Sequence, residues 1–155
     1  MTKKRIIDLE PFLDTMYGMW NAPFGTVEMV RSLFEPKIQS GDISDAVEWE
    51  CRRQGLDPKK VDWREMQTQD LIWLAFGGGR TYKTSPDKYA IELTVPTKIT
   101  TIRHEVRHIQ KGHVEDTYGN LSPKVRLKHH IMHIFRDEPL TFMYASTGPS
   151  YKPTP

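Results

Sequence analysis

The chain has little cysteine, no long apolar run and no strong excess of charge of either sign. Its single cysteine, Cys51, cannot form an internal disulfide, which excludes the disulfide-stabilised class of small secreted domains. Basic and acidic residues number 22 and 20 and are interspersed, so the net charge of +2 gives no footprint for nucleic acid. The lack of an apolar run or a charged-then-apolar leader argues against a membrane span and a secretion signal. We therefore expect a cytoplasmic protein, with neither nucleic acid nor a membrane as partner, in which Cys51 is a buried structural thiol.

The length of 155 residues and the 37% hydrophobic content suit one compact domain, and they leave the oligomeric state open. Proline and glycine divide the first half into segments with apolar residues at helical spacing, which predict helices over 9–19, 26–34, 44–55 and 62–76. Residues 1–80 are thus expected to form a helical support layer. The triple glycine that follows, Gly77–Gly79, lacks the Lys-Ser/Thr pair of a phosphate loop and is interpreted as a flexible connection.

A strand and a helix are predicted after the triple glycine. Apolar residues alternate through Tyr89–Val95, as in a half-buried, edge-type strand, and Pro96 ends it. Thr97 or Thr100 can cap the next helix, which is expected to run to Gly112. The predicted fold is therefore α+β and mainly helical, with a small antiparallel sheet, in one domain over residues 1–145. The polar, proline-rich residues 146–155 are predicted to be a disordered tail.

The most informative motif is His104-Glu105-Val106-Arg107-His108. On a helix, residues four apart lie on one face, so His104 and His108 can present two imidazoles to one Zn²⁺. Glu105 then lies beside the metal without being a ligand, where a carboxylate can take a proton from water. The spacing predicts a zinc hydrolase in which Glu105 is the general base.

The stretch Ile102–His113 resembles the metal helix of small zincins, especially the ImmA/IrrE-type and related minimal gluzincins, whose helix often ends in Gly-His as at Gly112-His113. Glu138–Ala145 resembles their second metal helix. The resemblance covers about residues 88–146 and implies a zincin-like domain, a metallopeptidase activity and Glu138 as the third ligand. Because Pro139 follows, Glu138 is expected at the very start of its helix. Lys111 and Val114 stand where a metzincin needs glycine and histidine.

The residues themselves leave the third ligand open, because all six histidines lie between positions 104 and 133. Ser122-Pro123 is a helix start, and on that helix Glu138 and the histidines would lie on neighbouring faces. The rival ligands are His113, His129, His130 and His133. A histidine-ligated site would resemble the SprT-type zincins more closely. An alternative role for His113 is only to hydrogen-bond the carbonyl groups at the end of the metal helix.

The expected reaction is hydrolysis of a peptide bond in a peptide or protein substrate, which the strand Tyr89–Val95 can bind by pairing. Candidate donors for the developing oxyanion are His113, Tyr118 and Tyr144. Arg103 and Arg107 are expected to face solvent. The alternative is a non-catalytic binding or structural protein that keeps a zincin-like fold with a structural metal site.

Overall fold

The computed structural model describes residues 10–67, 78–114, 127–128 and 131–152. In chain order these residues form α1 (Glu10–Leu33), α2 (Ser40–Arg53), a 3-10 helix (Pro58–Lys60), β1 (Val61–Glu65), β2 (Gly79–Ser85), β3 (Lys88–Leu93), α4 (Ile99–Gln110), a π-helix (His133–Asp137) and α6 (Glu138–Thr147). The α+β fold class predicted from the sequence is confirmed.

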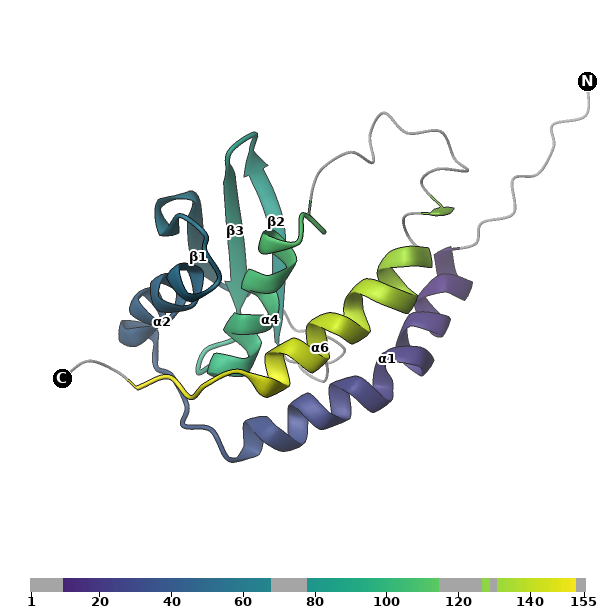
Figure 1. Ribbon diagram of the computed structural model, residues 1–155, viewed down its shortest axis with the longest axis horizontal. Coiled ribbons are helices and arrows are strands. Elements are labelled where there is room, and N and C mark those ends of the chain that lie inside the picture. The colour runs from purple at the N-terminus through teal and green to yellow at the C-terminus, as the bar shows by residue number, and fades with distance from the viewer. Residues whose placement is uncertain (1–9, 68–77, 115–126, 129–130, 153–155) are drawn as a thin grey trace, which may run out of the picture.

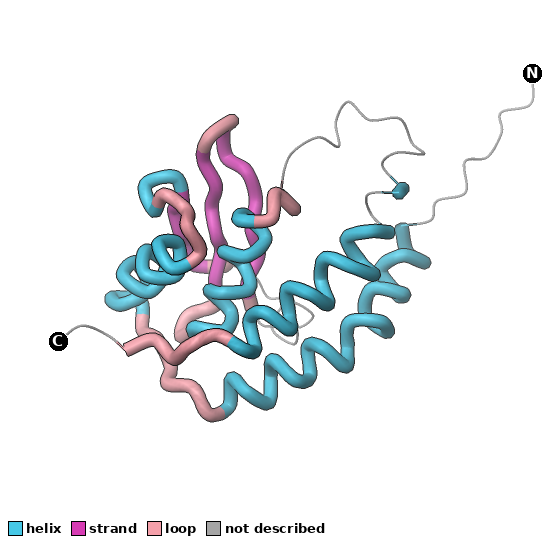
Figure 2. The backbone as a smooth tube through the Cα atoms, in the orientation of Figure 1, coloured by secondary structure: helices cyan, strands magenta, loops and turns pink. Residues whose placement is uncertain are grey.

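The elements form three layers, which Figure 1 and Figure 2 show in the same orientation. The sheet lies on one side, α2 and α4 pack next to it, and α1 and α6 run side by side against α4. The main core fills the space between the sheet, α2 and α4 and includes Ile43, Ile91, Leu93, Ile102 and Val106. The helix α4, which carries His104 and His108, therefore lies in the middle of the molecule.

The sheet is mixed, with the strand order β1-β3-β2. β1 pairs with β3 in parallel, with Val61 opposite Tyr89, and β2 pairs with β3 antiparallel, with Gly79 opposite Leu93. The sequence predicted an antiparallel sheet, which is wrong for the β1–β3 pair because these two strands are parallel. β3 confirms the strand expected near Tyr89–Val95 but lies in the centre, so it is not an edge strand and neither of its edges is left for a substrate.

Two strands lie where the sequence predicted other structure. The helix expected over 62–76 is wrong at its start, because Val61–Glu65 is β1, and its remainder, 68–77, lies outside the described residues. β2 begins at Gly79, inside the expected flexible connection. Residues 1–80 are thus not purely helical. Pairing with β3 decides both cases, since a five-residue segment has little helical stability of its own.

α1 is one helix of 24 residues, although the sequence predicted a break at residues 21–25. Pro23 lies inside it and removes the hydrogen bond to the Met19 carbonyl, which normally breaks a helix. Both residues are on the exposed side, where water can satisfy that carbonyl. On the opposite side, buried Asn21 donates from Nδ2 to the Ile134 carbonyl at 3.2 Å, so tertiary contacts hold the helix through the proline.

Arg103 is fully buried, which corrects the expectation that it faces solvent. Its guanidinium donates to the Ala145 carbonyl at 2.7 Å and to the Pro149 carbonyl, and its Nε lies 3.5 Å from Oε2 of Glu50, which is also fully buried. These contacts tie α4 to α2, to α6 and to the segment after it.

The segment after α6 remains on the domain as far as the structure describes it. α6 itself extends to Thr147, and Tyr151 is buried, with its ring 5.5 Å from that of Trp49. The predicted disordered tail over 146–155 is therefore wrong as far as Lys152. Composition alone could not reveal that Arg103 provides a partner for this segment. Among the described helices, none is both long enough and apolar enough to cross a membrane.

Cys51 lies in the core on α2, and burial raises the pKa of its thiol to about 12. The reactive thiolate is therefore almost absent at pH 8. We predict that the folded protein reacts negligibly with Ellman's reagent over minutes, whereas protein unfolded in guanidinium chloride reacts with one equivalent. Rapid stoichiometric labelling of the folded protein would contradict the placement of Cys51.

Candidate metal centre

Three candidate ligands meet between α4 and α6. Nε2 of His104 and Nε2 of His108 are 3.0 Å apart, as expected for residues one helical turn apart that point to the same place. From α6, Glu138 places Oε2 at 3.4 Å from His104 Nε2 and Oε1 at 3.2 Å from His108 Nε2. All three side chains are buried. This group of residues can hold a metal ion.

α4 is fixed on almost all sides, because ten of its twelve residues are buried. Its N-cap is Lys98 and not Thr97 or Thr100, and no side chain of its own caps it. Instead, Oε2 of Glu35, just beyond α1, accepts from the Thr100 backbone N–H at 3.2 Å and from the Thr100 hydroxyl. Gly112 ends the helix with a φ of 68°, as predicted. The two histidines therefore sit on a rigid support.

Glu138 reaches the site from the first residue of α6, as the following Pro139 required. The chain enters α6 through the π-helix His133–Asp137 and stays helical, with φ of −64° and ψ of −51° at Glu138. A π-helix is rare and concentrates at functional sites. Here it allows helical geometry before a proline and turns Glu138 toward α4.

Each histidine of the pair is held by a second contact on its other ring nitrogen. Nδ1 of His104 lies 3.1 Å from Oε2 of Glu28 on α1, and Nδ1 of His108 lies 3.1 Å from Nδ1 of His113. A carboxylate accepts only from N–H, so His104 carries a hydrogen on Nδ1. Histidine ligands of metals are typically oriented in this way.

His113 is best explained as a support for His108. Burial lowers the pKa of His113 to about 4, so its imidazole is neutral at pH 7 and can accept the Nδ1–H of His108. Its Nε2 faces Oδ1 of Asp137 at 3.8 Å. That chain of contacts leaves Nε2 of His108 free to act as a ligand.

His133, at the start of the π-helix, faces Glu138, with its Nε2 2.9 Å from Oε1. Together with His108 and His113 it forms a second, overlapping group with ligand atoms close enough for an ion. Oε1 of Glu138 is thus near two imidazoles, whereas its buried Oε2 has no hydrogen-bond donor among the described residues. This buried oxygen, 3.4 Å from His104 Nε2 and without a hydrogen-bond partner, is available to bind a metal ion.

The electrostatics favour an ionised Glu138 and a protonated His104 in this buried place. Burial would raise the pKa of Glu138, but the imidazoles of His108, His104 and His133 hold it well below its usual range. Burial would lower the pKa of His104, but Glu28 and Glu138 hold it well above. Burial raises the pKa of Glu28, and the nearby His104 only partly offsets this. Without a metal, the carboxylates of Glu28 and Glu138 balance the charge of a protonated His104. Binding of a metal ion to Nε2 of His104 would release that proton.

Glu105, which follows His104 on α4, is buried but belongs to neither group of ligand atoms. Its Oε2 accepts from the Thr81 hydroxyl on β2 at 2.6 Å. β2 approaches so closely at Gly79 that a Cβ there would lie 2.8 Å from Oε1 of Glu105. Gly79 is therefore what leaves room for this carboxylate.

The remaining candidates take other places. His129, His130 and Tyr118 lie outside the described residues. The Tyr144 ring lies under the guanidinium of Arg107, 4.0 Å away, which partly shields an arginine expected to face solvent. Sequence reasoning missed Glu28, Thr81 and Gly79. Glu28 had a signal, because it is the only charged residue between Thr15 and Val30 in a helix otherwise rich in apolar residues.

Comparisons of the chain with protein-family models, with curated proteins and with solved structures found no match.

Replacing Glu28 by glutamine should weaken metal binding by about 10-fold, because the residue that orients a ligand histidine typically affects affinity by this order. The measurement is competition for Zn²⁺ or Co²⁺ against a chromophoric chelator. Glu48→Gln, an exposed carboxylate on α2, is the matched control and should bind as the wild type does. Equal affinities for Glu28→Gln and wild type, with both folded, would show that Glu28 does not support the site.

Proposed function

We propose that the protein is a zinc-dependent metallopeptidase in which His104, His108 and Glu138 hold the ion and Glu105 is the general base. The observation that carries the proposal is that the candidate metal ligands and the candidate general base are different side chains with different partners. Three ligand atoms converge, and the carboxylate of Glu105, the buried residue that follows His104 on α4, is held by a different partner, the Thr81 hydroxyl. A catalytic zinc site needs this division between ligands and base.

The ligand set and its spacing support zinc. Two imidazoles and one carboxylate are among the usual ligand sets of catalytic zinc. Bonds from zinc to these atoms are about 2.0–2.1 Å, so two ligand atoms of a tetrahedral site are about 3.3 Å apart. The separations of 3.0, 3.2 and 3.4 Å are close to this value.

Zinc, when bound, supplies a Lewis acid that polarises a substrate carbonyl and lowers the pKa of water toward about 7. The residues of the chain supply the rest. Glu105 accepts the proton from the attacking water and returns it to the leaving amine, so the peptide C–N bond breaks while a C–O bond forms. The Thr81 hydroxyl keeps the Glu105 carboxylate in position, since it donates to Oε2 and leaves Oε1 for the proton.

The strand β2 is the element best placed to bind a substrate. It has one neighbour in the described sheet, β3, so its other edge presents backbone groups that an extended peptide can pair with. Thr81 and Gly79 on this strand contact Glu105, which brings that edge next to the base. β2 thus replaces Tyr89–Val95 as the strand proposed to hold the peptide.

A structural metal site is the second candidate, and His133 is the observation that favours it. Its Nε2 is 2.9 Å from Oε1 of Glu138, so a small movement would add a fourth protein ligand. Four protein ligands would leave no position for water and no role for Glu105 in chemistry.

Replacing Glu105 by glutamine separates the two candidates. For a peptidase, Glu105→Gln should retain the metal and the thermal stability but lower hydrolysis of a fluorogenic peptide library by about 100-fold or more, since a general base contributes at least that much. Metal content is measured by mass spectrometry of the same samples.

Glu48→Gln is the matched control, because Glu48 is an exposed carboxylate on α2 that pairs only with Arg52 among the described residues. It should cleave within about 2-fold of the wild-type rate, as surface changes away from a site usually do. If Glu105→Gln cleaves as fast as wild type, the peptidase mechanism is wrong.

A further inference from the structure

α1 has its polar and apolar sides reversed relative to a helix of an ordinary monomer. At about 100° per residue, Asn21, Glu28 and Glu35 fall on the side that faces the domain, and all three are buried. The opposite side is exposed and apolar. It carries Met19, Val30 and Leu33, with Trp20 and Val27 at its flank and Phe34 just beyond the helix, and we call these six residues the outer face of α1.

Polar contacts attach the inner side at four described residues, and the Trp20 ring at its flank packs 5.4 Å from that of Phe135. Asn21 bonds the Ile134 carbonyl, Glu28 bonds His104, and Glu35 bonds Thr100. Arg31 donates to the carbonyls of Ser146 and Gly148. An amphipathic helix usually turns its apolar stripe toward the core of its own chain. Here the inner positions serve the site, so the apolar residues of α1 are left on the outside.

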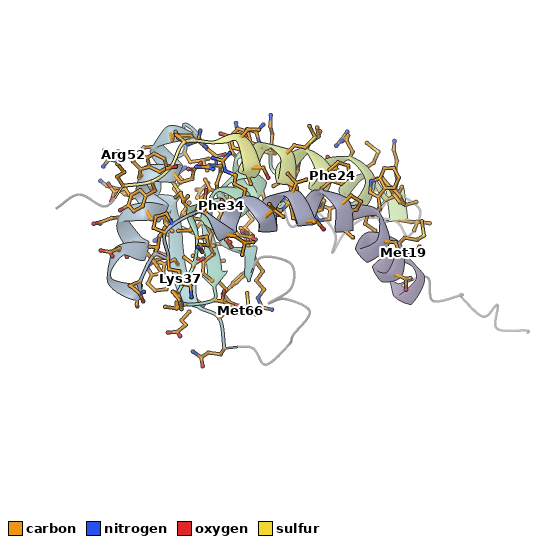
Figure 3. The ribbon with its side chains drawn as sticks, turned by 90° about the horizontal axis from the view of Figure 1, so that it is seen from below. Met19, Phe24, Phe34, Lys37, Arg52 and Met66 are labelled. Atoms are coloured by element: carbon orange, nitrogen blue, oxygen red, sulfur yellow. The ribbon has the colours of Figure 1, made fainter. Side chains whose placement is uncertain are left out.

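The outer face is large for a monomer. Phe34 is 86% exposed, and Met19 and Leu33 are each 71% exposed. Figure 3 labels Met19 and Phe34, which mark the two ends of the outer face along α1. With about 150–250 Å² for each large side chain, the six residues expose roughly 700 Å². The largest apolar patch on a typical monomer is about 300–600 Å², whereas one side of a stable protein interface is about 800 Å².

The charge of this face decides between a protein and a membrane as the partner. The other exposed residues of α1 between 15 and 33 are Thr15, Ala22, Pro23 and Thr26, so the described outer face has no charged side chain. A helix that binds a membrane surface combines its apolar side with lysine and arginine for anionic lipids. An apolar face without charge fits a protein surface of the same character.

We propose that the outer face of α1 is the interface of a homodimer, in which α1 of one copy packs against α1 of a second copy. A two-fold interface needs a self-complementary patch, and an uncharged apolar stripe is complementary to itself. From Met19 to Phe34 the stripe is about 22 Å long, enough for two helices to bury it mutually. Because α1 also holds Glu28, the interface lies on the back of the helix that orients His104.

Sedimentation velocity of the full chain at micromolar concentration tests the proposal. Wild type is expected at about twice the chain mass of 18.1 kDa. Val30→Glu should sediment at the mass of one chain, since it places a charge in the middle of the stripe. Phe34→Lys provides a second variant at the most exposed position, where folding does not depend on the side chain. Lys60→Glu, an exposed charge change at the end of the 3-10 helix, is the control and should remain dimeric.

Circular dichroism and zinc content of each variant should equal those of wild type, which separates loss of the dimer from loss of the fold. A wild type that is monomeric at these concentrations would overturn the proposal. The outer face would then be covered by another segment of the same chain or by a lipid surface. A dimer that survives both Val30→Glu and Phe34→Lys would also overturn it, because the interface would then lie elsewhere.

Discussion

The burial of Glu138 between the imidazoles of His104 and His108 is the interaction on which the rest of the structure depends. Removing a carboxylate from water is costly, and here the nearby imidazoles compensate for it. The fold provides what this requires. α4 is packed on nearly every side, the π-helix turns Glu138 inward, and α1 brings Glu28 to the far nitrogen of His104. A divalent ion would complete the same balance of charge.

Polar residues that support this site occupy the inner positions of α1, where a helix normally places apolar residues. Its inner positions are used for Asn21, Glu28 and Glu35, each of which bonds a group in another element. The hydrophobic stabilisation that such a helix gains from its own domain is therefore reduced, because Met19, Val27, Val30 and Leu33 are exposed. Pairing of two copies would restore that stabilisation. The proposed dimer and the candidate metal centre are thus two consequences of one arrangement.

The local parts of this picture could be predicted from the sequence, and the non-local parts could not. His104 and His108 lie one turn apart, so helix geometry alone places them together, and Gly112 marks where the helix ends. β1 and β2 were missed because each depends on pairing with β3, although Pro86 and Asp87 between β2 and β3 are turn residues. Glu28 and Arg103 act across layers of the fold, and no spacing rule connects positions so far apart in the chain.

Crystallography at the zinc absorption edge, on protein purified without chelator, tests the central claim most directly. An anomalous peak is expected between α4 and α6, within about 2.0–2.2 Å of Nε2 of His104, Nε2 of His108 and a carboxylate oxygen of Glu138. Glu105 should remain outside bonding distance of the ion. A peak bonded instead by His108, His113 and His133, or no peak in a protein folded as described, would contradict the account.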